Sequence, residues 1–122
     1  MGAVPTFGSV VLDCADPERV AGFYAELLDW PKATGRADWL TLNGPGGAQI
    51  EFQRAPDHQR PTWPTGERPQ QLHLDLRVTD LPAAHDRALA LGAELLDDQG
   101  MKSTGFRVYA DPAGHPFCLC AC

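Results

Sequence analysis

The stretch Ser9-Val-Val-Leu-Asp-Cys-Ala-Asp16-Pro17 returns in altered form as His73-Leu-Asp-Leu-Arg-Val-Thr-Asp80-Leu81. In both stretches, a segment of alternating character ends at an Asp that suits the N-cap of a following helix. A second pair of similar stretches, Pro45 to Phe52 and Pro112 to Leu119, closes the two copies. Asp16 and Asp80 are 64 positions apart (80 minus 16), and Glu51 and Cys118 are 67 apart (118 minus 51). An insertion of three residues in the second copy would therefore align both pairs. The sequence therefore predicts an internal duplication, in which Ser9 matches His73 and Glu51 matches Cys118.

The composition indicates an ordinary globular domain. With 122 residues, 43% hydrophobic and 21% charged, the chain is long enough for one real core. A net charge of -6 without a Lys/Arg cluster argues against nucleic acid and against anionic membranes as partners. No apolar run is long enough for a membrane span, and the first residues do not resemble a secretory signal. We therefore expect a cytoplasmic protein.

Each copy is expected to contain one helix and several strands. Apolar spacing and Pro17 predict a first helix over about 17–29, and a second is expected over about 81–91, closed by Gly92. The boundaries expected are module one at about 5–54, a linker at about 55–70 and module two at about 71–122. The linker is rich in Pro and carries Trp63, so it could also act as a lid. The expected strands are 39–43, 48–53, 72–78, 93–96, 106–110 and 116–121, with one or two more in module one.

Alternation along the strands separates a core face from a polar face. In Leu72 to Val78 the four apolar residues share one face, so the residues between them occupy the other. The same alternation applies to all four matching strands. If these strands form one curved sheet, their polar residues share its concave face: Ser9, Asp13, Gln49, Glu51, Gln53, His73, Asp75, Arg77, Cys118 and Cys120. Such a face could line a ligand cup or could simply be solvated.

The cysteines do not resemble a secreted disulfide framework. Cys118, Cys120 and Cys122 alternate on one expected strand, where neighbours are poorly placed to bridge, and Cys14 is remote. Free thiols are therefore expected.

Several residues have a structural interpretation beside a functional one. Asp75 and Arg77 could pair with each other on the surface. Trp39 and Tyr109 could be aromatic walls of a cup or could pack in the core. We expect His85 on the exposed side of the second helix. His58 and His115 have no expected partner at ligand spacing.

The chain resembles the glyoxalase/bleomycin-resistance/dioxygenase superfamily, also called the vicinal oxygen chelate superfamily. The resemblance rests on the paired copies, on Ala15 to Leu28, on Gln-Ile-Glu51-Phe and on Tyr109-Ala-Asp-Pro-Ala-Gly-His-Pro-Phe117. It implies an α+β fold of two tandem βαβββ modules that form a cupped, barrel-like mixed sheet with outer helices. It also implies a homodimer.

In many members of this superfamily a divalent metal is held by one residue from the first and last strand of each module. These positions carry Ser9, Glu51, His73 and Cys118 here. The usual residues are His or Gln at the first and Glu at the last, so Ser9 and Cys118 depart from the pattern. A hydroxyl is a poor ligand, and a thiol in place of a carboxylate favours zinc over magnesium.

Two main functions follow from this donor set. The first is a metal-free protein that binds a small organic molecule, with no cofactor, using Trp39, Gln49, Gln53, Trp63, Asp75, Arg77, Tyr109 and Cys120. The second is a metal-dependent lyase, isomerase or dioxygenase, with a metal such as zinc on Glu51, His73 and Cys118 and with Glu51 and His73 as catalytic residues. Metal-free acid/base catalysis by Glu51 and His73 is a third possibility.

Overall fold

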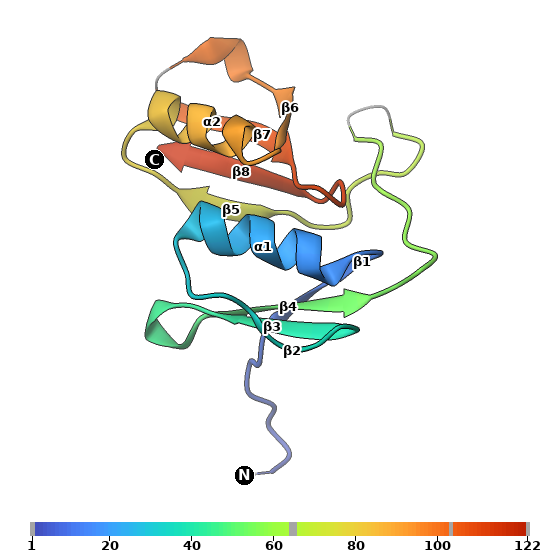
Figure 1. Cartoon of the computed structure of the whole chain (residues 1–122). Helices are drawn as coiled ribbons and strands as arrows, with labels where there is room; N and C mark the ends of the chain where they lie inside the picture. Colours follow the sequence, from blue (N-terminus) through green and yellow to red (C-terminus); the bar gives the residue numbers. More distant parts are fainter. Residues whose placement is uncertain (1, 64–65, 103, 122) are drawn as a thin grey trace. The chain divides into compact units, whose positions relative to one another are not determined.

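The computed structural model describes residues 2–63, 66–102 and 104–121 (Figure 1). Contacts within the chain divide it into two compact units, Met1–Pro56 and Asp57–Cys122. Each unit contains one α-helix and one four-stranded mixed sheet. We refer to the units as module one and module two and describe each by itself.

Module one follows the predicted βαβββ order. The sheet has the strand order β1-β4-β3-β2, with β1 parallel to β4 and the other pairs antiparallel. Helix α1 packs on one face of this sheet (Figure 1). Its elements are β1 (Val10–Cys14), α1 (Pro17–Leu28), β2 (Thr34–Arg36), β3 (Trp39–Asn43), a 3-10 turn at Pro45–Gly47 and β4 (Gln49–Arg54).

Module two repeats this arrangement. Its strand order, β5-β8-β7-β6, is that of module one, and β5 is again parallel to β8. Helix α2 packs against β8. The elements are β5 (Leu74–Arg77), α2 (Leu81–Ala90), β6 (Glu94–Asp97), a 3-10 turn at Gln99–Met101, β7 (Gly105–Ala110) and β8 (Pro116–Ala121).

The duplication extends to the register of the parallel pairs. Val11 lies opposite Glu51 in module one, and Asp75 lies opposite Cys118 in module two. The matched residues Glu51 and Cys118 thus occupy equivalent positions in the two sheets. The prediction of two tandem βαβββ modules is thus confirmed, and the strands form two four-stranded mixed sheets, one in each module.

The helix ends are set by the residues that the sequence indicates. The Asp16 carboxylate accepts from the backbone N–H of Arg19 at 3.3 Å, and the Asp80 carboxylate accepts from Ala83 N–H at 3.1 Å. Each bond satisfies one of the N–H groups that a helix leaves unpaired in its first turn. The second helix ends before Gly92, whose φ of 107° is the left-handed conformation that glycine favours after a helix.

A stacked aromatic pair lies in the core of each module. In module one Tyr24 of α1 stacks on Phe52 of β4, with ring centroids 6.1 Å apart. In module two Tyr109 of β7 stacks on Phe117 of β8 at 5.4 Å. All four rings are fully buried. They are the apolar anchors that fix the sheets and, with them, the polar faces.

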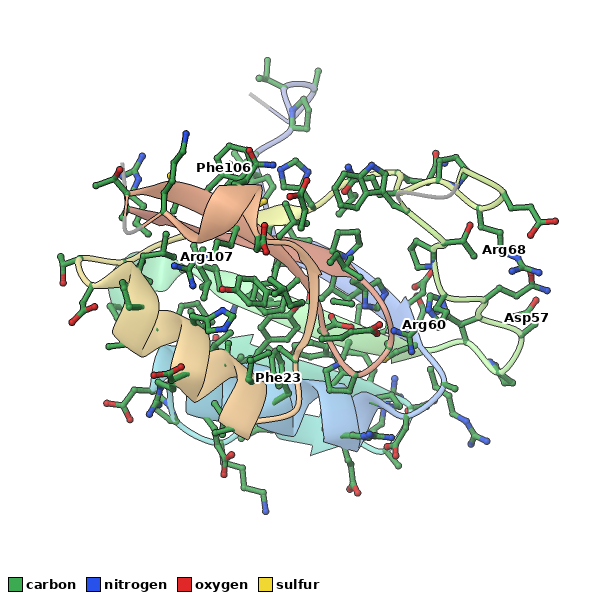
Figure 2. All side chains as sticks on the ribbon, turned by 90° about the horizontal axis from the view of Figure 1, so that it is seen from above. Phe23, Asp57, Arg60, Arg68, Phe106 and Arg107 are labelled. Atoms are coloured by element: carbon green, nitrogen blue, oxygen red, sulfur yellow. The ribbon has the colours of Figure 1, made fainter. Side chains whose placement is uncertain are left out.

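The predicted linker is attached to module two. The guanidinium of Arg60 pairs with the Glu94 carboxylate at 3.2 Å, and His58 Nε2 lies 3.1 Å from the carbonyl of Ala113. Within the segment, Thr62 N–H donates to Arg68 C=O at 2.7 Å. Figure 2 labels Asp57, Arg60 and Arg68 along this segment. No helix among the described residues is long and apolar enough to cross a membrane.

Candidate functional site

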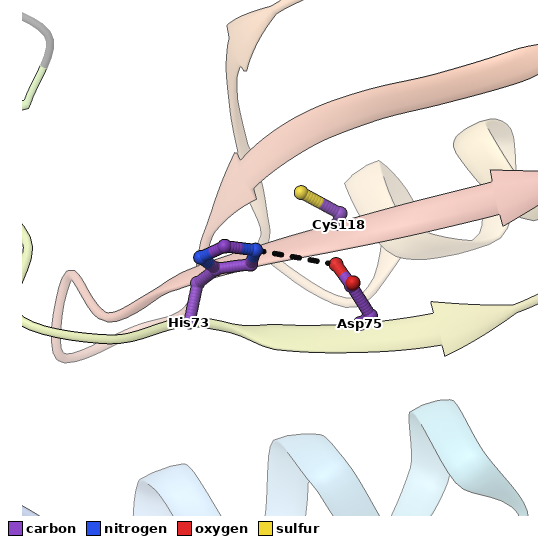
Figure 3. A group of neighbouring side chains, drawn as sticks. All are labelled: His73, Asp75 and Cys118. Carbon is purple, nitrogen blue, oxygen red and sulfur yellow. Dashed lines mark ion pairs between the residues drawn. The ribbon is translucent and has the colours of Figure 1, made fainter.

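Three side chains that could act as metal ligands converge on the first and last strands of module two. His73 directly precedes β5, Asp75 lies within it, and Cys118 lies on β8 opposite Asp75. One donor atom from each lies within 4.8 Å of the other two, and the side chains point toward one another (Figure 3). His73 Nε2 is 3.3 Å from Asp75 Oδ1. We call these three residues the module-two triad.

Asp75 has a different partner from the one that its sequence neighbours indicate. The alternative drawn from the sequence is an ion pair with Arg77, whereas the structure pairs Asp75 with His73. The side chains of His73 and Asp75 are largely exposed and that of Cys118 is buried. The triad therefore combines two solvent-accessible donors with one protected sulfur.

The thiol of Cys118 is held in its protonated form. Burial raises its pKa to about 11, and the negative charge of Asp75 adds to this shift, as does a hydrogen bond to that carboxylate. At neutral pH the thiol is thus a weak nucleophile. Its sulfur would become a thiolate only where a strong positive charge replaced the proton.

A cavity of about 290 Å³ lies beside the triad in module two. His73 and Cys118 form part of its wall, and Trp63 and Phe106 supply aromatic surface. This volume is at the small end of the range for ligand sites in proteins, roughly 300–1,000 Å³. The remaining lining residues are Gln70, Asp97, Gln99 and Val108.

One polar atom in the cavity wall is buried without a partner. The Oε1 atom of Gln70 has no hydrogen-bond partner among the described residues. A buried acceptor of this kind costs about 1–3 kcal/mol when it is left unsatisfied. A ligand with a donor group would remove that cost.

Among the described residues that line a second cavity in module two, none has a buried side-chain N or O atom without a hydrogen-bond partner. This cavity measures about 300 Å³ and shares Trp63 with the first. Its two charged residues, Arg60 and Glu94, pair with each other at 3.2 Å. The first cavity therefore presents the stronger reason to bind a ligand.

The polar face of module one is already satisfied internally. Glu51 accepts hydrogen bonds from the hydroxyl of Ser9, from Trp39 Nε1 at 2.9 Å and from the hydroxyl of Thr41 at 2.9 Å. These donors lower the pKa of the Glu51 carboxyl, with Ser9 contributing most. Glu51 is thus held ionised by neutral donors, and Ser9 is committed to it as a donor.

The Glu51 cluster makes a pH prediction. The pKa of the Glu51 carboxyl is lower in the folded protein than its value of 4.5 in the unfolded chain. The stability that this difference contributes is therefore fully present above pH 4.5 and is lost as the pH falls through the pKa of the folded protein. We expect the unfolding free energy of the Glu51→Gln variant to lie below that of the parent protein at pH 7. The gap should narrow below pH 4.5, as measured by urea unfolding at a series of pH values. A gap that widens in acid would contradict this account.

The other predicted residues of module one lie on the expected face. Gln49 donates through Nε2 to the side-chain oxygen of Asn43 at 2.8 Å. Gln49 and Gln53 are exposed, and Ile50 and Phe52 between and beside Glu51 are buried, as alternation predicts.

Tyr109 lies on the opposite face from the one that a cup wall requires. It lies opposite Phe117 in the β7–β8 register, so its ring faces the core with Phe117, whereas Val108 and Cys118 share the other face. The core alternative drawn from the sequence therefore describes Tyr109. Its hydroxyl lies 2.8 Å from His85 Nδ1, and burial raises its pKa.

The expectation that His85 is exposed is wrong. The residue is only 9% exposed, and its ring is paired with Tyr109. The residue that corresponds to Trp39 is Phe106, since Trp39 lies opposite Gln53 and Phe106 lies opposite Cys120. Figure 2 labels Phe106 and its neighbour Arg107, of which the first is exposed and the second buried. The pairing register of β7 with β8 is the signal that would have identified Phe106 as the match of Trp39.

The thiols of the last strand differ from one another. Cys14 and Cys118 form no disulfide, whereas Cys120 is disulfide-bonded, so the expectation of a free thiol at Cys120 is corrected. Cys122 lies outside the described residues. Arg77 is exposed and lies opposite Cys120 in the β5–β8 register.

A histidine pair that the sequence did not reveal lies at the turn before β8. Asp111, whose side chain is fully buried, holds His115 Nδ1 at 3.0 Å, and the His58 ring lies 5.0 Å from the His115 ring. The sequence indicated no partner at ligand spacing for either histidine, whereas the structure brings the two rings together and pairs His115 with Asp111. His58 comes from the segment before β5, so its proximity depends on tertiary folding.

A family model described as "Glyoxalase-like domain" matches residues 9–120 of the chain. A comparison with curated proteins finds no match.

Solved structures with the same fold share little sequence with this chain. One is the fosfomycin resistance protein FosX from Mesorhizobium loti (TM-score 0.71, 12% identity, 98% of this chain and 93% of that chain covered). Another is a glyoxalase/bleomycin resistance protein/dioxygenase family enzyme from Burkholderia phytofirmans (TM-score 0.72, 14% identity, 92% and 94% covered). A possible glyoxalase from Bacillus cereus is similar too (TM-score 0.69, 11% identity, 96% and 99% covered). At these identities the likeness concerns the fold.

Proposed function

Because this chain belongs to the glyoxalase-like domain family, we propose that it binds a small, partly aromatic organic molecule that carries a hydrogen-bond donor. The observation that carries the proposal is the cavity of about 290 Å³ with its unpartnered Gln70 Oε1. Trp63 and Phe106 would contact the flat part of the ligand, and Gln70 would accept from its donor.

The charge of the site favours a cationic or neutral ligand over an anion. Asp97 lies in the cavity wall, Asp75 lies beside Cys118, and the whole chain carries a net charge of -6. An anionic ligand would be repelled by these carboxylates. An aromatic amine fits both the acceptor and the charge.

The test compares benzylamine, benzyl alcohol and benzoate as probes, with binding followed by ligand-observed NMR. We expect affinity to fall in that order. Gln70→Met, which removes the acceptor at similar volume, should weaken benzylamine binding by up to about tenfold. Phe106→Ala should weaken it also, whereas Phe7→Ala should not, because Phe7 is 82% exposed and belongs to module one. Equal binding of all three probes, or no effect of Gln70→Met and Phe106→Ala, would refute the proposal.

A metal-dependent lyase, isomerase or dioxygenase is the second candidate function. The convergence of His73 and Cys118 favours it. In that function a metal would polarise substrate oxygens, and His73 and Cys118 would be among its ligands. Glu51 fits this role poorly, because three donors already occupy its carboxylate.

The family also supports a homodimer that acts in the cytoplasm. Light scattering of the purified protein tests the first of these proposals.

A further inference from the structure

We propose that module two binds one zinc ion by itself, through His73, Asp75 and Cys118, in place of the four-residue site shared by both modules that the family resemblance implies. Zinc binding by the triad needs no organic ligand, so failure of the proposed ligand binding would leave this proposal standing. In this proposal Asp75 is a metal ligand, whereas Glu51 and Ser9 are not.

The donor chemistry of the triad fits zinc. Zinc accepts imidazole nitrogen, carboxylate oxygen and thiolate sulfur together, and three protein ligands with one open position are common for this ion. Magnesium and calcium prefer oxygen ligands throughout, so the sulfur of Cys118 argues against them. In a tetrahedral zinc site, neighbouring ligand atoms lie roughly 3.4 Å apart, as bond lengths near 2.1 Å require.

The geometry of the triad is close to this arrangement. His73 Nε2 and Asp75 Oδ1 are 3.3 Å apart, and one donor atom of each residue lies within 4.8 Å of the others. Asp75 already contacts both His73 and the Cys118 thiol, so small rotations of the exposed His73 and Asp75 side chains would bring the three donor atoms to ligand spacing. The ion would replace the proton on Cys118 and would neutralise Asp75.

Module one lacks the corresponding donor. The position that matches Asp75 is Val11, which lies opposite Glu51 as Asp75 lies opposite Cys118. Valine offers no ligand atom. Ser9, which matches His73, donates a hydrogen bond to Glu51. Trp39 and Thr41 donate hydrogen bonds to the same carboxylate. A metal on Glu51 would have to displace donors that already stabilise its charge.

The open position of the zinc ion would face the cavity, since both His73 and Cys118 lie in its wall. A water molecule or an oxygen atom of a bound molecule could complete the coordination there. The proposed zinc site and the cavity would thus lie next to each other within module two.

The experiment measures zinc affinity by competition with a chromophoric chelator, on protein purified without a metal-affinity tag. We expect one zinc per chain. Asp75→Asn, His73→Gln and Cys118→Ser should each weaken zinc at least tenfold, as loss of a ligand costs more than loss of an outer-sphere partner. Cobalt in place of zinc should give a sulfur-to-metal charge-transfer absorption that Cys118→Ser removes. Circular dichroism of Asp75→Asn checks its folding, which its exposure should leave intact.

The matched control is Glu51→Gln. The proposal requires this variant to bind zinc as tightly as the parent protein and to keep the cobalt absorption. A loss in Glu51→Gln as large as that in Asp75→Asn would place the metal in the shared site and overturn the proposal. Substoichiometric zinc in the parent protein would overturn it as well.

Discussion

Replacing Phe117 by Ala is expected to lower the free energy of unfolding by about 3–5 kcal/mol. The Phe117 ring is fully buried, stacks on Tyr109 at 5.4 Å and lies on the strand that pairs with both β5 and β7. Its removal leaves a cavity that the paired strands around it cannot close, and it removes the ring contact of Tyr109. Urea or guanidinium unfolding, followed by circular dichroism, measures the change.

The matched control for Phe117→Ala is Phe106→Ala. Both residues are phenylalanines of module two, but Phe106 is 42% exposed. We expect its loss to cost about 1 kcal/mol or less. Similar losses for the two variants would mean that the β7–β8 core is not the main apolar anchor of module two.

The second large effect is expected for Asp111→Ala, at about 3 kcal/mol of unfolding free energy. The carboxylate accepts from the backbone N–H of Ala113 at 2.8 Å and of His115 at 3.0 Å, and it holds His115 Nδ1. Alanine would leave two turn N–H groups and the imidazole without this acceptor. The turn is also tight, since Gly114 has a φ of 89° and a Cβ there would lie 2.4 Å from Arg60 Cβ.

Asp111→Asn separates the two parts of this effect. The amide oxygen retains an acceptor for the turn N–H groups, but the negative charge beside His115 is lost. A smaller loss than for alanine is expected, about half of it. If Asp111→Ala unfolds at the same denaturant concentration as the parent protein, the carboxylate does not hold the turn.

The fold could be predicted from the sequence because its signals are local. Asp16 and Asp80 cap the two helices as expected, and alternation in Gln49 to Gln53 separated the buried Ile50 and Phe52 from the polar positions. Alternation was less informative in Leu72 to Val78, because Leu74 and Leu76 are only half-buried and Leu72, expected on the core face, is 57% exposed. The short strand β2 was expected only as one option, because Thr34–Arg36 carries a single Gly and no apolar residue. The match between the two copies agrees with the register of both parallel strand pairs, in which Glu51 and Cys118 hold equivalent positions.

The site could be predicted only in part because partners are chosen by tertiary structure. The sequence placed His73 and Cys118 together but left Asp75 with two alternatives, a surface ion pair with Arg77 or a role in binding a ligand, and did not indicate its pairing with His73. It could not show that Glu51 is occupied by Ser9, Trp39 and Thr41, since these donors come from separate segments. Of the two interpretations of Tyr109, a cup wall or core packing, the structure supports core packing, because Phe106 rather than Tyr109 matches Trp39 in the strand register.

The parallel pairing of β5 with β8 also has a consequence for folding kinetics. Leu74 lies opposite Phe117, 43 positions later (117 minus 74), so this contact closes a long loop and is slow to form. A ribosome must release nearly all of module two before His73, Asp75 and Cys118 can meet. A ligand that needs this cluster would bind only after β8 has docked, so it should slow unfolding while leaving the folding rate unchanged.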